Sequence, residues 1–225
     1  YISEIKPNID PLHEILKSDY SGFTFLDEFS VGDDLKSKTN LKKFKEEFLK
    51  KYPDIASKKH PGLSDLKSIE HNIALLSLYE KIKDKKILDN YNKIRKEIYE
   101  KYNPKINIDE KLITQQLLIS LLEYDKIKSL AKGINQPLTM LELGAGYGRT
   151  ANMILSIDPK TKYVIADLPP SLYFSLRNLR ETFKDKKIKV AISIETPDEM
   201  KNALENNDIL FILPHQLNLF DKKIF

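Results

Sequence analysis

Glycines gather in one short stretch of this chain of 225 residues. Three of the seven glycines, Gly144, Gly146 and Gly148, fall within the segment LELGAGYGRTA at 141–151. This spacing after a short apolar run predicts a strand that turns at once into a helix. In such a turn the first glycine permits the tight bend, the second leaves bare backbone for a ligand, and the third lets the helix pack closely. The N–H groups at the start of the helix then face whatever binds there.

Charged residues beside these glycines distinguish the ligands that use such turns. A dinucleotide site requires glycine or alanine at position 149, where this chain has Arg149. A P-loop is excluded because no Gly-Lys-Ser or Gly-Lys-Thr follows. Glu142 would repel a pyrophosphate but suits a ligand with a cationic group, such as an ammonium or a sulfonium. The residues favour a cationic ligand and leave a dinucleotide-dependent oxidoreductase of nucleotide sugars as the weaker alternative.

A second acidic residue, Asp167, ends the apolar run KYVIAD at 162–167. The carboxyl ends of parallel strands share one edge of a sheet, so we expect Asp167 at the ligand edge. A carboxylate only accepts hydrogen bonds and can take both hydroxyls of a ribose. The alternative is an acid that caps the following helix, but Ser171 stands at a better position for that cap. We therefore expect Asp167 to bind a ribose.

These segments resemble a known family when they are taken together with ADLPPSLYFS at 166–175 and FILPHQL at 211–217. They are similar to class I S-adenosylmethionine (SAM)-dependent methyltransferases, and more narrowly to the sugar O-methyltransferases of bacterial surface-polysaccharide loci. The resemblance covers roughly 138–220 and is weak before that. It implies a Rossmann-like parallel α/β sheet, SAM as cofactor, and methyl transfer to a hydroxyl of a sugar or glycan precursor.

The resemblance also implies roles for particular residues. Glu142 would lie near the methionine end of SAM, and Asp167 would bind the ribose. Tyr147 would cover the methionine part or the acceptor, unless it is an exposed loop aromatic. Arg149 would pair with the SAM carboxylate or with Glu142, unless it lies on the helix surface. The full set of expected cofactor-binding residues is Glu142, Gly144, Ala145, Gly146, Tyr147, Gly148, Arg149, Asp167, Leu168, Leu213, Pro214, His215 and Gln216.

A catalytic base is not identified by the sequence. A sugar hydroxyl is a weak nucleophile until its proton is removed, and His215 is the only histidine of the α/β part. Its place in LPHQL puts it nearer the cofactor, so the catalytic residue stays unassigned. His13, His60 and His71 stand at no metal-ligand spacing, and we expect no metal site. A non-catalytic SAM-binding module is the alternative to an enzyme.

Strands and helices alternate in the second part of the chain, which we place at 133–225. Short apolar runs predict strands at 138–143, 162–167, 187–192 and 208–213, with amphipathic helices between them, the last capped by Thr196. This alternation predicts a parallel, doubly wound sheet. About four strands are few for such a sheet. We therefore expect the natural chain to continue beyond Phe225, and also before Tyr1, which is not a methionine.

The first part, 1–132, has mainly helical patterns. We expect helices over 40–52, from Ser64 onward, over 89–104 and over 109–131, the last with Asp109 as its N-cap and Gly133 as its stop. The segment FTFLDEF at 23–29 is either a short strand or irregular. We expect this region to form a lid, an oligomer surface or the substrate side.

The composition excludes several classes of protein. The net charge is +4, from 37 basic and 33 acidic residues that alternate along helical patterns, which argues against a nucleic-acid partner. The absence of cysteine excludes disulfides and thiolate metal sites and fits a cytoplasmic protein. No apolar run approaches the ~20 residues of a membrane span, and no signal peptide opens the chain. We expect a cytoplasmic bacterial enzyme, and a homo-oligomer is one assembly that its helical region allows.

Overall fold

The computed structural model describes residues 46–47, 49–56, 58–60, 64–84, 87–102, 104–133 and 137–221. These residues belong to two compact units. Unit 1 holds the described residues up to Glu80 together with Tyr102–Ile113, and unit 2 holds Lys81–Lys101 together with Thr114 onward. The division therefore does not follow the predicted boundary at residue 132. The segment predicted at 23–29, His13 and the start of the helix predicted from residue 40 lie outside the described residues.

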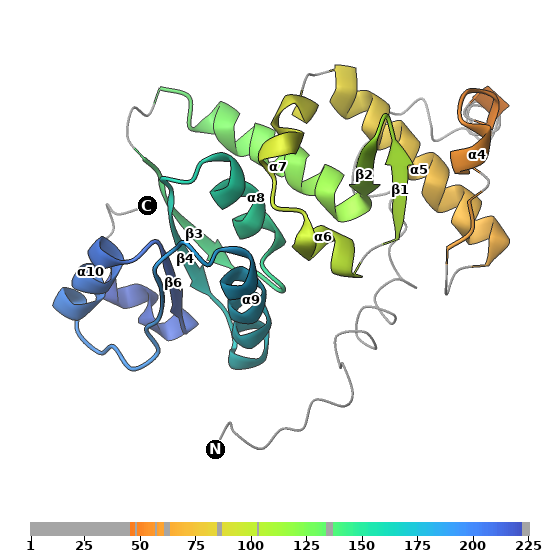
Figure 1. The fold of residues 1–225 in the computed structure, drawn as a ribbon. Coiled ribbons are helices and arrows are strands. Elements are labelled where there is room, and N and C mark those ends of the chain that lie inside the picture. The colour runs from red at the N-terminus through yellow and green to blue at the C-terminus, as the bar shows by residue number, and fades with distance from the viewer. Residues whose placement is uncertain are drawn as a thin grey trace. The chain divides into compact units, whose positions relative to one another are not determined.

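The sheet of unit 2 is parallel, as predicted from the alternating pattern (Figure 1). Its described strands are β3 (Thr139–Leu143), β4 (Lys162–Ala166), β5 (Ile188–Val190) and β6 (Ile209–Ile212). Each lies within a run that the sequence assigned to a strand. The strands β4 and β6 are buried almost throughout, because parallel strands are covered by helices on both faces.

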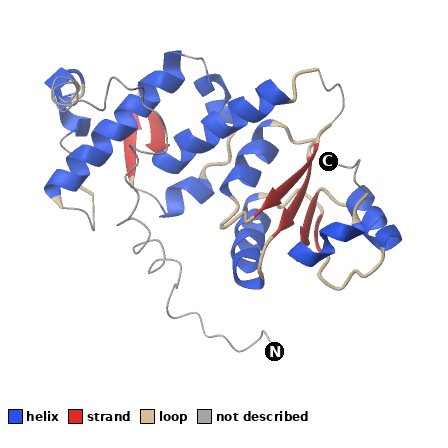
Figure 2. Ribbon diagram, turned by 180° about the vertical axis from the view of Figure 1, so that it is seen from behind, coloured by secondary structure: helices blue, strands red, loops and turns tan. Residues whose placement is uncertain are grey.

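Three helices connect these strands: α8 (Arg149–Ile157), α9 (Pro169–Thr182) and α10 (Pro197–Asn206). Parallel crossovers are right-handed, so α8 and α9 lie on one face and α10, which leads back across the sheet, lies on the other (Figures 1 and 2). The α10 face is closed by a buried apolar cluster that includes Met200, Ala203 and Leu204 of the helix and Val164, Ala166, Leu210 and Ile212 of the strands. Thr196 caps α10 as predicted, since its Oγ1 accepts from the Glu199 N–H.

The strand order is β3-β4-β6-β5. In the dinucleotide-binding form of this architecture the first strand lies between the second and the fourth. In this sheet the strand that comes first in the chain, β3, lies at an edge of the described strands. The fourth strand of the sheet in chain order, β6, pairs with the second, β4. The fold is thus an α/β sheet compatible with a Rossmann-like fold, with a different neighbour for its fourth strand.

A β-hairpin precedes the long helix α7 (Gln115–Leu130), which begins at Gln115 rather than at Asp109. The hairpin consists of β1 (Lys105–Ile108) and β2 (Lys111–Thr114). Its two turn residues, Asp109 and Glu110, both have left-handed backbone, with φ of 48° and 62°. The predicted N-cap was therefore wrong: Asp109 lies in a two-residue turn, and Thr114 caps α7 by accepting from the Leu117 N–H.

The remaining described helices are α4 (Pro53–Ala56), α5 (Asp65–Asp84), the 3₁₀ helices η2 (Ile87–Lys93) and η3 (Pro214–Leu219), and α6 (Glu97–Tyr102). The helix predicted to follow Ser64 is confirmed as α5. The single helix predicted over 89–104 was wrong, because η2 and α6 are separated at 94–96. Among the helices built from described residues, none is both long and apolar enough to cross a membrane.

Candidate functional site

The glycine turn lies at the carboxyl end of β3. Gly144, Gly146 and Gly148 have φ of 75°, 56° and 88°, a region that disfavours any residue with a side chain. A Cβ placed on Gly144 or Gly146 would meet no atom within 4 Å, whereas one on Gly148 would lie 3.3 Å from Leu179 of α9. The first two glycines therefore border open space, and the third allows close packing against a helix.

Asp167 follows β4 and lies against this turn. Its Oδ2 accepts from the Gly146 N–H at 3.3 Å, and its Oδ1 accepts from the Leu168 N–H at 2.7 Å. The residue is only 9% exposed. Each carboxylate oxygen has a further lone pair, so the group retains acceptor capacity for a ligand. The structure thus brings together two features that the sequence analysis predicted separately.

The helix that follows Asp167 begins earlier than expected. Leu168 is the N-cap residue of α9, and Pro169 and Pro170 occupy its first two positions. Ser171 is inside the first turn, so its prediction as the cap was wrong. Proline lacks an N–H, so the start of α9 has fewer donors to satisfy. The Asp167 carboxylate bonds to N–H groups outside α9 instead.

Exposed apolar side chains line the same edge of the sheet. Leu143 ends β3, Leu168 follows β4 and Ile192 follows β5, and they are 65%, 64% and 51% exposed. These three residues, which we call the apolar rim, are among the most exposed large apolar residues of the described chain. Single exposed apolar residues are common on protein surfaces, but these three stand at the edge where doubly wound sheets bind their ligands. Sequence reasoning selected Leu168 alone; the position of Leu143 and Ile192 at strand ends was the available signal.

Glu142 is on β3, immediately before the glycine turn. Its Oε2 accepts from the Tyr163 hydroxyl of β4 at 3.0 Å. Burial raises the pKa of the Glu142 carboxyl, and the hydrogen bond from Tyr163 acts in the opposite direction. Burial and the neighbouring Glu142 raise the pKa of Tyr163. The acid predicted to face the cofactor thus has a partner within the sheet.

Arg149, the first residue of α8, pairs with Glu123 rather than with Glu142. Its guanidinium makes two hydrogen bonds to the Glu123 carboxylate of α7, at 2.7 and 2.8 Å, and a third to Ser120 at 3.0 Å. It therefore does not lie free on the helix surface. Sequence reasoning missed Glu123, because no local pattern links it to a residue so much later in the chain.

Two other residues of the turn are packed into the protein. Ala145 is 6% exposed, and its carbonyl accepts from the Gly148 N–H at 2.8 Å. Tyr147 is partly buried, and its carbonyl accepts from the Asn178 side chain of α9 at 3.1 Å. The alternative of a fully exposed loop aromatic does not describe Tyr147.

The segment after β6 lies beside Asp167, since the Asp167 N–H donates to the Ile212 carbonyl at 3.4 Å. Gln216 is 2% exposed and fully engaged with the backbone. Its Nε2 donates to the carbonyls of Ala191 and Ile194, and its Oε1 accepts from the Leu213 N–H. We assign Gln216 to the scaffold. Pro214 and His215 are exposed, and Leu213 is partly buried, at this edge.

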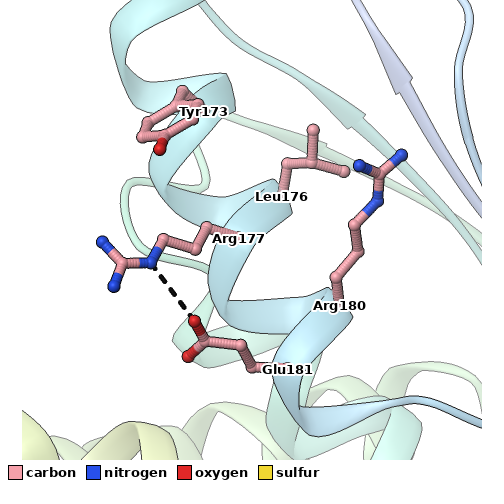
Figure 3. Close-up of a pocket in the computed structure, with 5 residues that line it drawn as sticks. All are labelled: Tyr173, Leu176, Arg177, Arg180 and Glu181. Atoms are coloured by element: carbon pink, nitrogen blue, oxygen red, sulfur yellow. Dashed lines mark hydrogen bonds and ion pairs between the residues drawn. The ribbon is translucent and has the colours of Figure 1, made fainter. Parts of the chain in front are cut away.

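A hollow of about 270 Å³ lies elsewhere, along α9. Figure 3 shows its lining, which is formed by Tyr173, Leu176, Arg177, Arg180 and Glu181 of that one helix, with an ion pair between Arg177 and Glu181. It contains no residue of the predicted site. Within the part of the chain that the structure describes, no three His, Cys, Asp or Glu side chains gather closely enough to hold a metal ion.

This edge of the sheet combines bare backbone at the glycine turn, a buried acceptor at Asp167 and exposed apolar side chains. Comparisons of the chain with protein-family models, with curated proteins and with solved structures give no match. The resemblance to methyltransferases therefore rests on the motif segments of the sequence.

Proposed function

We propose that the glycine turn and Asp167 bind SAM and that the protein is a SAM-dependent O-methyltransferase of a sugar or glycan precursor. The observation that carries the proposal is the Asp167 carboxylate, which is buried against the Gly146 N–H at the carboxyl edge of the sheet. A buried acceptor beside bare backbone is what a ribose next to a glycine turn requires. The sugar acceptor is supported by the family resemblance alone.

The parts of an adenosyl ligand find matching chemistry at this edge. Asp167 supplies acceptors for the ribose hydroxyls, and Leu168 supplies apolar surface for the base. The open space over Gly144 and Gly146 leaves room for the rest of the ligand. Parallel strands are spaced by about 4.8 Å, so the ends of neighbouring strands can contact one small ligand together. The residues present therefore fit SAM.

The strand order decides from which side the segment after β6 contributes. Because β6 pairs with β4, residues 213–215 flank Asp167 rather than the glycine turn. A ribose held by Asp167 would place its base on that side, towards Leu168 and Leu213. This agrees with the adenine-side role that the resemblance implies for that segment.

A dinucleotide is less well supported than SAM. A pyrophosphate would sit at the start of α8, where dinucleotide sites carry their third glycine and this chain has Arg149. The Arg149 guanidinium is engaged by the Glu123 carboxylate, which leaves its charge compensated within the protein. Glu142 adds another carboxylate close to the turn.

When bound, SAM supplies a methyl group on a positively charged sulfur, and transfer joins that carbon to the acceptor oxygen while the carbon–sulfur electron pair goes to sulfur. The described residues would act by alignment. Asp167 would fix the ribose, and the glycine turn would keep the space above the backbone open, so that the donor is held in one orientation. The acceptor's proton needs a base. His215 is exposed at this edge, and the base stays unassigned.

Isothermal titration calorimetry on the full chain tests the proposal. We expect SAM and S-adenosylhomocysteine to bind in the micromolar range and NAD not to bind. Saturable NAD binding without SAM binding would refute it. If SAM binds while no sugar acceptor is methylated, the second candidate, a non-catalytic SAM-binding module, replaces the enzyme.

The variant Asp167→Asn tests the residue that carries the proposal. We expect it to weaken SAM binding by about 1–3 kcal/mol, roughly 5- to 150-fold, because buried hydrogen bonds to a charged acceptor are lost. Asp198→Asn, on the exposed first turn of α10, is the matched control and should bind SAM as the wild type does. Equal affinities for all three proteins would remove Asp167 from the site.

A further inference from the structure

The second half of the glycine turn is held in place by elements on several sides. The Asn178 side chain of α9 donates to the Tyr147 carbonyl, and Leu179 packs against the Gly148 backbone. The Tyr99 hydroxyl of α6 donates to the Arg149 carbonyl at 2.6 Å. The turn therefore has its shape fixed by its neighbours in the ligand-free protein.

Glu123 makes the most directional of these contacts. Its two oxygens accept from the two terminal nitrogens of Arg149, and Oε2 also accepts from the Thr150 hydroxyl at 3.3 Å. The side chains of the pair are only 26% and 31% exposed. Bidentate pairs between arginine and a carboxylate fix orientation as well as distance. One carboxylate of α7 thus holds the first two residues of α8.

The charge of Glu123 has a second effect at this position. The start of a helix carries a partial positive charge, so a cation there is unfavourable. Arg149 is the first residue of α8, and Glu123 compensates its charge. Without that compensation the guanidinium would be drawn to another carboxylate, of which Glu142 is close enough for its charge to be affected by Arg149.

We propose that Glu123 is a positioning residue of the ligand site: through Arg149 and Thr150 it fixes the start of α8, and so holds the glycine turn in its binding conformation before the ligand arrives. The inference rests on the proposed function only in taking SAM as the ligand. The inference states that α7 fixes the conformation of the glycine turn, although α7 contributes no residue to it.

The variant Glu123→Gln tests this role, because it keeps the size of the side chain and removes its charge. Hydrogen–deuterium exchange on the ligand-free full chain should show at least tenfold faster exchange in 144–151, with 199–206 of α10 unchanged. Calorimetry should show about tenfold weaker SAM binding. Glu123→Asp, which keeps the charge, should restore part of both. The control is Glu181→Gln, which removes an exposed ion-pair partner of Arg177 on α9 and should change neither.

The outcomes separate the two proposals. If the wild type binds no SAM, the proposed function fails, while the exchange of 144–151 still tests Glu123. If Glu123→Gln accelerates exchange in 144–151 no more than Glu181→Gln does, or equally in 144–151 and 199–206, Glu123 is not a positioning residue. Should Glu123→Gln not fold, Arg149→Lys, which keeps the charge but loses the bidentate geometry, must give the same local acceleration.

Discussion

The glycines of the turn differ in which atoms lie near the position that a Cβ would take. Gly146 and Gly148 share left-handed backbone, but only Gly148 has a close neighbour, since Leu179 lies 3.3 Å from the place that a Cβ would take. A side chain at Gly146 would enter the open space that the proposed ligand would occupy, and one at Gly148 would push against Leu179 of α9. The two positions therefore separate binding from stability within one turn.

Gly148→Ala should lower the free energy of unfolding by about 2 kcal/mol, because backbone strain and crowding against α9 act together. Chemical denaturation measures the change. Gly133→Ala is the matched control, since Gly133 also has left-handed backbone, with φ of 98°, but no atom within 4 Å of an added Cβ. It should cost only the backbone term of about 1 kcal/mol. Equal losses would show that Leu179 accommodates the methyl group without cost.

The site residues that could be predicted from the sequence were those that follow directly after predicted strands. The glycines, Asp167 and Leu168 follow strand ends, and the rule that strand ends share an edge brings them together. Glu123 could not be found in this way, since its pairing with Arg149 depends on how α7 packs. The buried amide of Gln216 gave the sequence no sign that its hydrogen bonds serve the scaffold rather than a ligand.

At the scale of elements, the hairpin β1–β2 shows how local chemistry can mislead. Two-residue turns of this kind usually contain asparagine, aspartate or glycine, because both residues need left-handed backbone. Here the second is Glu110, an exposed residue with φ of 62°. An acid before an apolar run also resembles a helix N-cap, which explains why Asp109 was misassigned.

Glu110→Gly should raise the free energy of unfolding by about 0.5–1 kcal/mol, because glycine takes up left-handed backbone without strain. Thermal unfolding would show this as a higher midpoint. The control, Asn107→Gly in β1, lies on an exposed strand position without left-handed backbone and should destabilise by a similar amount. A lower midpoint for Glu110→Gly would mean that this side chain contributes more than its backbone strain costs.

The strands of the sheet were predictable as elements, whereas their order was not. Apolar runs between glycine, proline and charged residues locate each strand. Which strands pair depends on the packing of α8, α9 and α10, and no local pattern encodes it. The position of β6 beside β4 is the result.

At the scale of the whole molecule, the sequence changes near residue 133 from mainly helical patterns to alternating strands and helices. This change does not coincide with the division into two units. Segments before that point belong to unit 2, and side chains on them make specific contacts with later residues. Arg95 donates to the Thr182 carbonyl and pairs with Asp185, and Tyr124 donates to Asp158. These contacts join residues far apart in sequence, which is why composition alone could not reveal them.

Unit 1 contains a pair of histidines that should make the stability of the whole chain depend on pH. His60 is 5% exposed, and its Nε2 shares a hydrogen bond with Asn72 at 2.6 Å. The His71 ring contacts the edge of His60, with 5.3 Å between ring centroids, and its Nε2 is buried with no hydrogen-bond partner among the described residues. Burial, and then the neighbouring His60, lower the pKa of His71 to about 4.

The expected pH dependence follows from this lowered pKa. An unfolded histidine has a pKa of about 6.5, so the unfolded chain binds a proton that folded His71 refuses. The stability from neutral His71 is complete above pH 6.5 and is lost as pH falls towards 4, by up to about 3 kcal/mol. Urea denaturation at pH 7 and pH 5 measures it. His71→Leu should remove this slope, and His215→Leu, at an exposed position, should keep it; identical slopes in all three proteins would contradict the assignment.

The side chain of Gln216 has a mechanical consequence for the edge where the ligand is proposed to bind. It joins the backbone after β5, at Ala191 and Ile194, to the backbone after β6, at Leu213. A displacement of one of these loops would therefore stretch hydrogen bonds to the other. We expect the two loops to move together. Of the apolar rim, only Ile192 lies on a loop that Gln216 holds, so its backbone should be less free to shift than its side chain.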